Sequence, residues 1–137
     1  MLLGLFVGFA TGSVKAGENT LAISQTRVAP ALRTADTPVF MTITNTGAAD
    51  VLLRTRCPAA NFSEMHTVDH GEGSPAMRVV KSIPIAANGV TQLNSDGYHV
   101  MLLQIGHDLV GGETFSCSVT FRDAGKQDVE VAVGAAQ

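Results

Sequence analysis

The chain has 137 residues, which is the length of a single domain large enough to bury a hydrophobic core. Its formal net charge is −3, so it lacks the basic surface typical of a nucleic-acid-binding domain, and we expect no nucleic-acid partner. The two cysteines, Cys57 and Cys117, do not form a Cys-x-x-Cys pair, which argues against a zinc ribbon and a thioredoxin-like redox motif.

The first element of the chain is an expected export signal at residues 1–16. Residues 2–10 form an apolar run that is too short to cross a bilayer as a helix. Val14 and Ala16 provide small residues at the two positions that signal peptidase reads. The alternative is an apolar N-terminal strand of the fold. Cleavage would leave a domain of residues 17–137 without a membrane-spanning segment, in the periplasm or another extracytoplasmic compartment.

Short segments with alternating apolar residues, separated by turn residues, make up the rest of the chain. They lie at residues 20–28, 39–45, 50–57, 62–68, 77–81, 83–85, 90–93, 98–105, 114–121 and 129–133. We expect about eight or nine of these segments to form strands, and strands with this spacing are typical of a β-sandwich or barrel, so we expect an all-β domain. Asn88-Gly89, between two of the shortest segments, predicts a hairpin.

Both cysteines fall on the apolar side of their segments. Val51, Leu53 and Cys57 share the side of segment 50–57 that is expected to face the core, and Cys117 lies among apolar residues of its own segment. A buried pair facing across a sandwich would form a disulfide if the two Cα atoms lie within about 7 Å, and an oxidising compartment would permit it. The alternatives are two buried free thiols, copper ligation, or thiol exchange with a partner.

Side chains that bind soft metals are concentrated between residues 65 and 101. The stretch contains three methionines and three histidines, namely Met65, His66, His70, Met77, His99 and Met101. Thioether sulfur is a soft, neutral ligand and imidazole is a borderline one, so the set suits copper, preferably Cu(I), and disfavours Mg²⁺, Ca²⁺ and Mn²⁺. Imidazole binds a metal only when it is neutral, so copper affinity should fall below about pH 6.

Four of these side chains are predicted to converge at one end of the sandwich. They are His66, Met77, His99 and Met101. His99 and Met101 lie two residues apart on a strand and therefore share a face, which Leu103 and Ile105 are expected to continue into the core. The other two residues come from strand ends on either side of a polar loop. Three strand ends would thus meet at one exposed ion that a partner protein can reach.

The spacing of these four residues, H-x10-M-x21-H-x-M, resembles the pattern of the PCuAC family of periplasmic copper chaperones. Residues 41–47, 50–52, 77–78 and 97–101 are similar to other characteristic segments of that family, and the resemblance covers residues 19–133. It implies a cupredoxin-like Greek-key β-sandwich that binds Cu(I) through the two histidines and two methionines. It also implies a copper-accepting partner outside the cytoplasm, such as the copper-centre domain of a respiratory oxidase.

Two of the six side chains have more than one interpretation. Met65 either packs in the core or serves as an auxiliary ligand, because methionine is a common filler of hydrophobic cores. His70 is either part of the loop surface or an accessory ligand for Cu(II), which imidazole suits. We regard both residues as accessory candidates.

The alternatives to a copper chaperone differ in how well the residues support them. Glu64 and Asp69 lie near His66, but hydrolytic zinc sites do not use two thioethers, so we expect no enzyme. An electron-transfer cupredoxin needs a Cys-His-Met loop, and the chain has neither His nor Met after Cys117. A copper buffer or resistance protein without a dedicated acceptor is the main alternative to a monomeric chaperone.

Overall fold

The computed structural model describes residues 20–71, 73 and 76–134. The predicted export signal at residues 1–16 lies outside this range. Within it, the regular structure consists of strands, and no helix is long and apolar enough to cross a membrane. The all-β prediction is therefore confirmed.

Ten strands run through the described residues, where the sequence pattern predicted about eight or nine. They are β1 (Leu21–Val28), β2 (Thr37–Asn45), β3 (Asp50–Arg56), β4 (Ala60–Asp69), β5 (Ala76–Val80), β6 (Ile83–Ile85), β7 (Gly89–Leu93), β8 (His99–Ile105), β9 (Thr114–Phe121) and β10 (Gly125–Val133). The hairpin predicted at Asn88-Gly89 is wrong. A turn does occur there, and Asn88 has a φ of 47°, but β6 pairs with β3 and β7 pairs with β2. Each short strand is stabilised by a longer one instead of by its neighbour in sequence.

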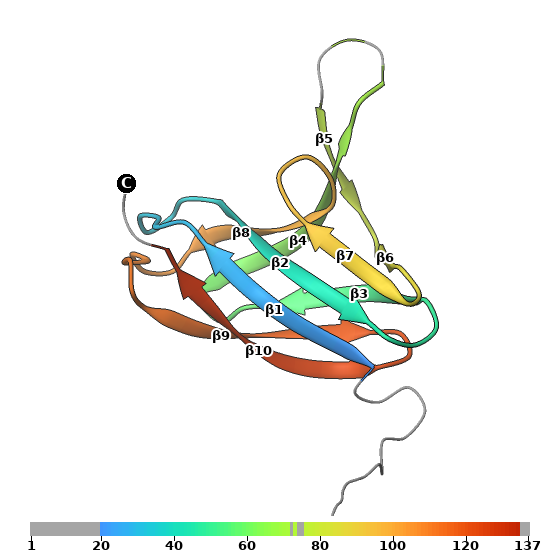
Figure 1. Ribbon diagram of the computed structural model, residues 1–137. Helices are drawn as coiled ribbons and strands as arrows, with labels where there is room; N and C mark the ends of the chain where they lie inside the picture. The colour runs from blue at the N-terminus through green and yellow to red at the C-terminus, as the bar shows by residue number, and fades with distance from the viewer. Residues whose placement is uncertain (1–19, 72, 74–75, 135–137) are drawn as a thin grey trace, which may run out of the picture.

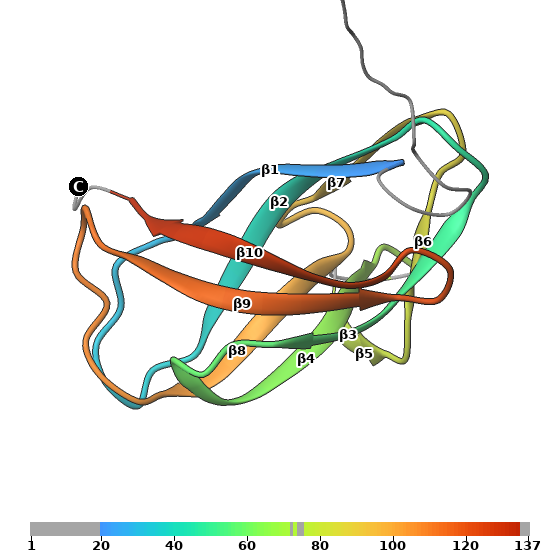
Figure 2. The same ribbon diagram turned by 90° about the horizontal axis from the view of Figure 1, so that it is seen from below.

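The strands form one continuous sheet that folds over into two layers (Figure 1). Their order is β5-β4-β8-β2-β1-β10-β9-β3-β6, and β7 also pairs with β2. The layers are joined where the end of β1 runs parallel to β10, with Arg27 opposite Ala132 and Val28 opposite Val133. Figure 2 shows β9 and β10 crossing in front of β2 and β8, as expected for a sandwich. The far ends of β4 and β5 extend beyond the body as an arm (Figure 1).

The hydrophobic core lies between the two layers. β2 illustrates how the sequence builds it, because Val39, Met41 and Ile43 are buried while the residues between them are half-buried on the outer face. Residues of the other layer, including Leu52 and Val131, are also fully buried. Burial of each such side chain contributes roughly 1.5–3 kcal/mol. The core thus fixes which face of each strand points outward.

An irregularity in β3 reverses the side-chain alternation that the sequence predicted. The register of β3 with β9 shifts between Leu52 and Arg54. As a result Leu52 is buried, whereas Leu53, which was expected to face the core, is 41% exposed. A bulge of this kind adds a residue to one strand and leaves little trace in the apolar pattern.

A second correction concerns β8, the strand that carries two predicted ligands. Val100 and Leu102 fill the core, whereas Leu103 is half-buried on the opposite side. Ile105 is buried as well, because Gln104 has a positive φ of 58° and breaks the alternation after Leu103. The face that carries the predicted ligands therefore does not continue into the core at Leu103. It is the outer surface of the sandwich.

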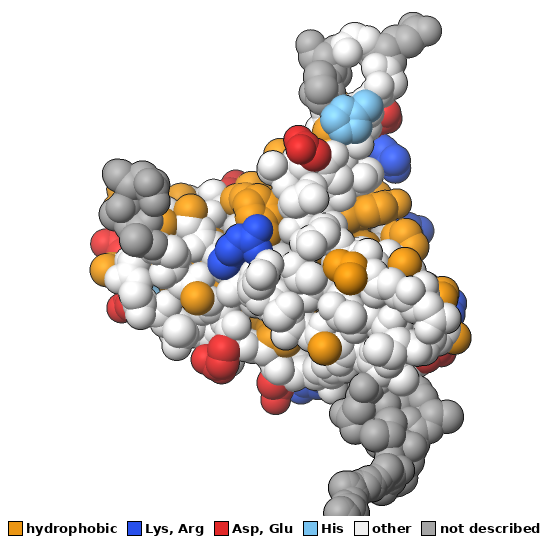
Figure 3. Space-filling view, in the orientation of Figure 1, with side chains coloured by type: hydrophobic (Ala, Val, Ile, Leu, Met, Phe, Trp, Pro, Cys, Tyr) orange, Lys and Arg blue, Asp and Glu red, His pale blue; other side chains and the backbone are white. Residues whose placement is uncertain are grey.

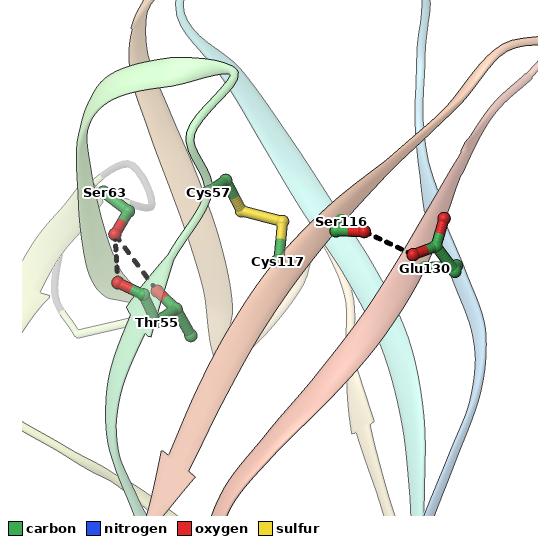
Figure 4. Close-up of a disulfide and its surroundings, with 6 residues drawn as sticks. All are labelled: Thr55, Cys57, Ser63, Ser116, Cys117 and Glu130. Atoms are coloured by element: carbon green, nitrogen blue, oxygen red, sulfur yellow. Dashed lines mark hydrogen bonds between the residues drawn. A yellow bond between two sulfur atoms is a disulfide. The ribbon is translucent and has the colours of Figure 1, made fainter.

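Cys57 and Cys117 form a disulfide (Figure 4). Cys57 follows β3, and Cys117 lies in β9, the neighbour of β3 in the same layer. The bond therefore joins adjacent strands and does not face across the sandwich, as the sequence interpretation had assumed. Close by, the Ser63 hydroxyl of β4 donates a hydrogen bond to the Thr55 carbonyl of β3 (Figure 4). In this state neither cysteine offers a thiolate to a metal.

Hydrogen bonds to Asp50 link the turn between β9 and β10 to the start of β3. Its buried carboxylate accepts hydrogen bonds from the backbone N–H groups of Val51, Asp123 and Ala124, at 2.7, 2.9 and 3.0 Å. We expect Asp50→Ala to lower the free energy of unfolding by about 2–3 kcal/mol, because three N–H groups lose their acceptor. Urea unfolding measures the loss. Asp123→Ala is the control, since its exposed carboxylate contacts Arg122, and equal losses in the two variants would contradict the assignment.

Candidate metal centre

The four predicted ligands lie on the outer face of β4, β5 and β8. The pairing of β8 with β4 sets His99 opposite His66 and Met101 opposite Glu64. β5 pairs with the other edge of β4, and its register puts Met77 on the same face. Residues opposite one another in antiparallel strands share a face, so all four side chains project from one side of the sheet. The pairing register of the three strands, and not proximity in sequence, brings the four side chains to one face.

His99 occupies the centre of this arrangement and is only 3% exposed. Its Nδ1 lies 3.1 Å from the backbone carbonyl oxygen of Gly97. A carbonyl oxygen can only accept a hydrogen bond, so Nδ1 carries the proton. In the neutral ring Nε2 then holds a lone pair, and this atom lies 3.2 Å from Met77 Sδ. Two electron-pair donors from different strands therefore face each other.

The separation of His99 Nε2 and Met77 Sδ is close to that of two ligands on one ion. With bonds of about 2.0–2.3 Å, two donors of a tetrahedral ion lie roughly 3.5 Å apart. The observed separation of 3.2 Å is slightly shorter. Met77 is 57% exposed on the edge strand β5, so its flexible side chain can move outward by the small amount needed.

His66 contributes a second imidazole beside the first. The two ring centroids lie 5.6 Å apart, with an interplanar angle of 67°. His66 Nε2 lies 2.9 Å from Glu64 Oε1. His66 Nδ1 is buried and has no hydrogen-bond partner among the described residues. Each of the two histidines thus has one ring nitrogen engaged by the protein and the other available.

Met101 lies in the next row of the same face. It follows His99 by two residues on β8 and is half-buried between Glu64 of β4 and Pro38 of β2, its partners on either side. Its thioether is on the side of the sheet where the two imidazoles lie. The structure therefore places His99 in contact with Met77 and beside His66, and it places Met101 one row farther along β8.

Phe40 and Arg27 complete the surroundings, and sequence reasoning missed both. The Phe40 ring packs edge-on against His99, with centroids 6.4 Å apart and an interplanar angle of 77°. The Arg27 guanidinium lies over the Phe40 ring, 5.7 Å from its centroid. Phe40 alternates with the core residues of β2, which is a signal that it faces outward. Its contact with His99, however, depends on the pairing of β2 with β8.

The two accessory candidates are not part of the cluster. Met65 is buried in the core on the opposite face of β4 from His66, so the structure assigns it to packing and not to metal binding. His70 lies at the start of the arm's loop, where its Nε2 is 3.1 Å from the carbonyl oxygen of Asp96. It links the arm to the turn that precedes β8.

The donor set is limited to imidazole and thioether. Across residues 20–71, 73 and 76–134, no group of three or more His, Cys, Asp or Glu side chains is placed to hold a metal ion. A metal centre built from the four candidate ligands therefore combines imidazole with thioether donors. Hard ions such as Mg²⁺ and Ca²⁺ are poor occupants of such a site, whereas Cu(I) accepts both donor types.

Comparison with known proteins places the chain in a family. A profile of the LpqE-like lipoprotein family matches residues 21–133, which is most of the chain. Among curated proteins, none matches. Several solved structures do match the chain, and three of them serve as examples.

The copper-bound PCuAC domain from PmoF2 is 16% identical, with a TM-score of 0.71 over 87% of this chain and 96% of that domain. The apo PCuAC domain from PmoF1 is also 16% identical, with a TM-score of 0.73 over 87% and 97%. The solution structure of CuI-DR1885 from Deinococcus radiodurans is 29% identical, with a TM-score of 0.65 over 88% and 83%. These matches confirm the resemblance to the PCuAC family and its cupredoxin-like sandwich, and the chain belongs to the LpqE-like lipoprotein family.

Proposed function

We propose that this protein is an extracytoplasmic copper chaperone that carries one Cu(I) on the outer face of β4, β5 and β8 and delivers it to the copper centre of a respiratory oxidase. The ligands are His66, Met77, His99 and Met101. The observation that carries the proposal is the 3.2 Å approach of His99 Nε2 to Met77 Sδ, with the His99 proton held on the other nitrogen. Two solved relatives contain copper by their descriptions, the PCuAC domain from PmoF2 and CuI-DR1885.

The differing exposure of the ligands suits a metal ion that must be released to another protein. His99 is buried, whereas Met77 is exposed on an edge strand. Apolar side chains gather on either side of the arm where it leaves the body, which offers an acceptor protein a surface to approach (Figure 3). Met77 is the ligand that an acceptor would replace first, because it is the most accessible of the four.

The disulfide and the family both support a location outside the cytoplasm. Structural disulfides form and persist in oxidising compartments, and the chain joins Cys57 to Cys117. The matching family is one of lipoproteins. Thioether ligands suit such a compartment, since methionine binds copper without a free thiol that oxidation would consume.

Electron transfer by a blue-copper site is less well supported. Such a site requires a cysteine thiolate, and both cysteines are committed to the disulfide. Catalysis is also less well supported, because a set of two imidazoles and two thioethers leaves no position arranged to activate water. A copper buffer with the same ligands differs from a chaperone only in having no dedicated acceptor.

Copper transfer tests the proposal. The protein loaded with one Cu(I) is expected to give most of its copper to an excess of an isolated oxidase copper-centre domain, measured as copper content after the two proteins are separated. The matched control is an acceptor domain that lacks its own copper ligands, which should receive none. Copper retained on the chaperone would favour the buffer. An intense blue colour on addition of Cu(II) would instead favour electron transfer.

A further inference from the structure

Glu64 makes a contact with the metal centre that the donor set does not require. It precedes His66 by two residues on β4, so both side chains lie on the outer face, and it stands opposite Met101 of β8. Its Oε1 lies 2.9 Å from His66 Nε2. The Glu64 side chain is 41% exposed, and the His66 side chain is 12% exposed. A half-exposed carboxylate therefore holds a nearly buried imidazole.

The direction of this hydrogen bond determines which nitrogen of His66 can bind a metal. An ionised carboxylate only accepts hydrogen bonds, so the proton lies on Nε2. In the neutral ring the lone pair is then on Nδ1. That atom is buried and has no hydrogen-bond partner within the described part of the chain. Buried polar atoms are nearly always satisfied, and an exception of this kind often marks a functional atom.

His99 has the same arrangement, but the roles of Nδ1 and Nε2 are exchanged. Its Nδ1 proton is engaged by the Gly97 carbonyl, and its Nε2 faces Met77 Sδ. Metal-binding histidines commonly donate their second N–H to a carboxylate or a backbone carbonyl, which fixes the tautomer and the ring orientation. Glu64 thus accepts a hydrogen bond from one ring N–H of His66, as the Gly97 carbonyl does from His99.

We propose that Glu64 is a positioning residue that fixes His66 in the tautomer whose Nδ1 binds Cu(I), while His99 binds through Nε2. The proposal rests on the proposed copper binding. Glu64 also supplies a negative charge beside four neutral ligands, which favours a bound cation. Removal of such a partner typically lowers metal affinity about 10–100-fold.

Two measurements test the role of Glu64. Glu64→Ala is expected to lower Cu(I) affinity about 10–100-fold in competition with a bathocuproine-type chelator. Glu64→Gln, whose amide oxygen still accepts the Nε2 proton, should restore most of that loss. Glu130→Ala removes one negative charge from β10 and is the matched control, with affinity expected to stay unchanged. Equal affinity in Glu64→Ala and the control would overturn the proposal.

¹⁵N NMR of the histidine rings identifies which ring nitrogen binds Cu(I). In the apo protein, His66 should show a protonated Nε2, and this hydrogen-bonded signal should be lost in Glu64→Ala. On addition of Cu(I), the large shift should occur at Nδ1 of His66 and at Nε2 of His99. A shift at His66 Nε2 would overturn the proposal. Failure of the wild-type protein to bind Cu(I) would overturn the proposed function itself, and with it this role.

Discussion

The double variant Met77→Leu and Met101→Leu is expected to bind Cu(I) at least about a hundredfold more weakly than the wild-type protein. Leucine preserves the volume and the apolar surface of methionine, so the fold should tolerate both changes, but the sulfur donors are lost. A structural four-ligand metal site contributes about 10–16 kcal/mol in all, which is roughly 3 kcal/mol, or a hundredfold, for each ligand. His99→Gln removes one donor, the one that faces Met77, and should by itself weaken binding about a hundredfold.

Matched controls separate the ligands from their surroundings. Met41→Leu makes the same substitution at a buried core position, and it should leave copper affinity unchanged. His107→Gln is the control for His99→Gln, since His107 is exposed and its Nδ1 contacts the backbone of Asp108. Affinity is measured by competition with a Cu(I) chelator. If the double methionine variant binds Cu(I) as tightly as Met41→Leu does, the methionines are not ligands.

The shared face of two candidate ligands could be predicted from the sequence, but the geometry of the candidate site could not. Strand alternation is local, so the shared face of His99 and Met101 followed from their spacing alone. The 3.2 Å approach of His99 to Met77 depends instead on two registers, that of β8 on β4 and that of β5 on β4. A shift of one residue in either register would turn a ligand to the opposite face. The apolar pattern does not specify such pairings.

Two errors about strand faces involve irregular backbone. Leu53 was expected in the core, but the register shift in β3 places it outside. Leu103 was expected to share a face with the buried Ile105, but the positive φ of Gln104 breaks the alternation between them. Bulges and single residues with positive φ are set by the tertiary structure more than by local sequence. The correction matters for the candidate site, because it puts the four candidate ligands on the outer surface of the sandwich.

The double variant Cys57→Ala and Cys117→Ala is expected to lose about 4 kcal/mol of stability. The disulfide joins residues separated by 60 positions, and the chain-entropy estimate for a loop of that length is about 4 kcal/mol. Alanine avoids burying an unpaired polar group in their place. The loss is a large share of the roughly 5–15 kcal/mol by which a domain is usually stable. Urea unfolding should show a lower midpoint and a larger m value, since the unfolded chain expands.

Copper binding distinguishes this structural role from a role in the metal centre. The disulfide joins β3 to β9 in the opposite layer from β4 and β8, so the folded variant should bind Cu(I) as tightly as the wild-type protein. The wild-type protein treated with a reductant should match the variant in both stability and affinity. If Cys57→Ala weakens Cu(I) binding as much as His66→Gln does, the cysteines belong to the metal centre after all. An unchanged affinity with a loss of about 4 kcal/mol would show that the disulfide stabilises the fold and takes no part in copper binding.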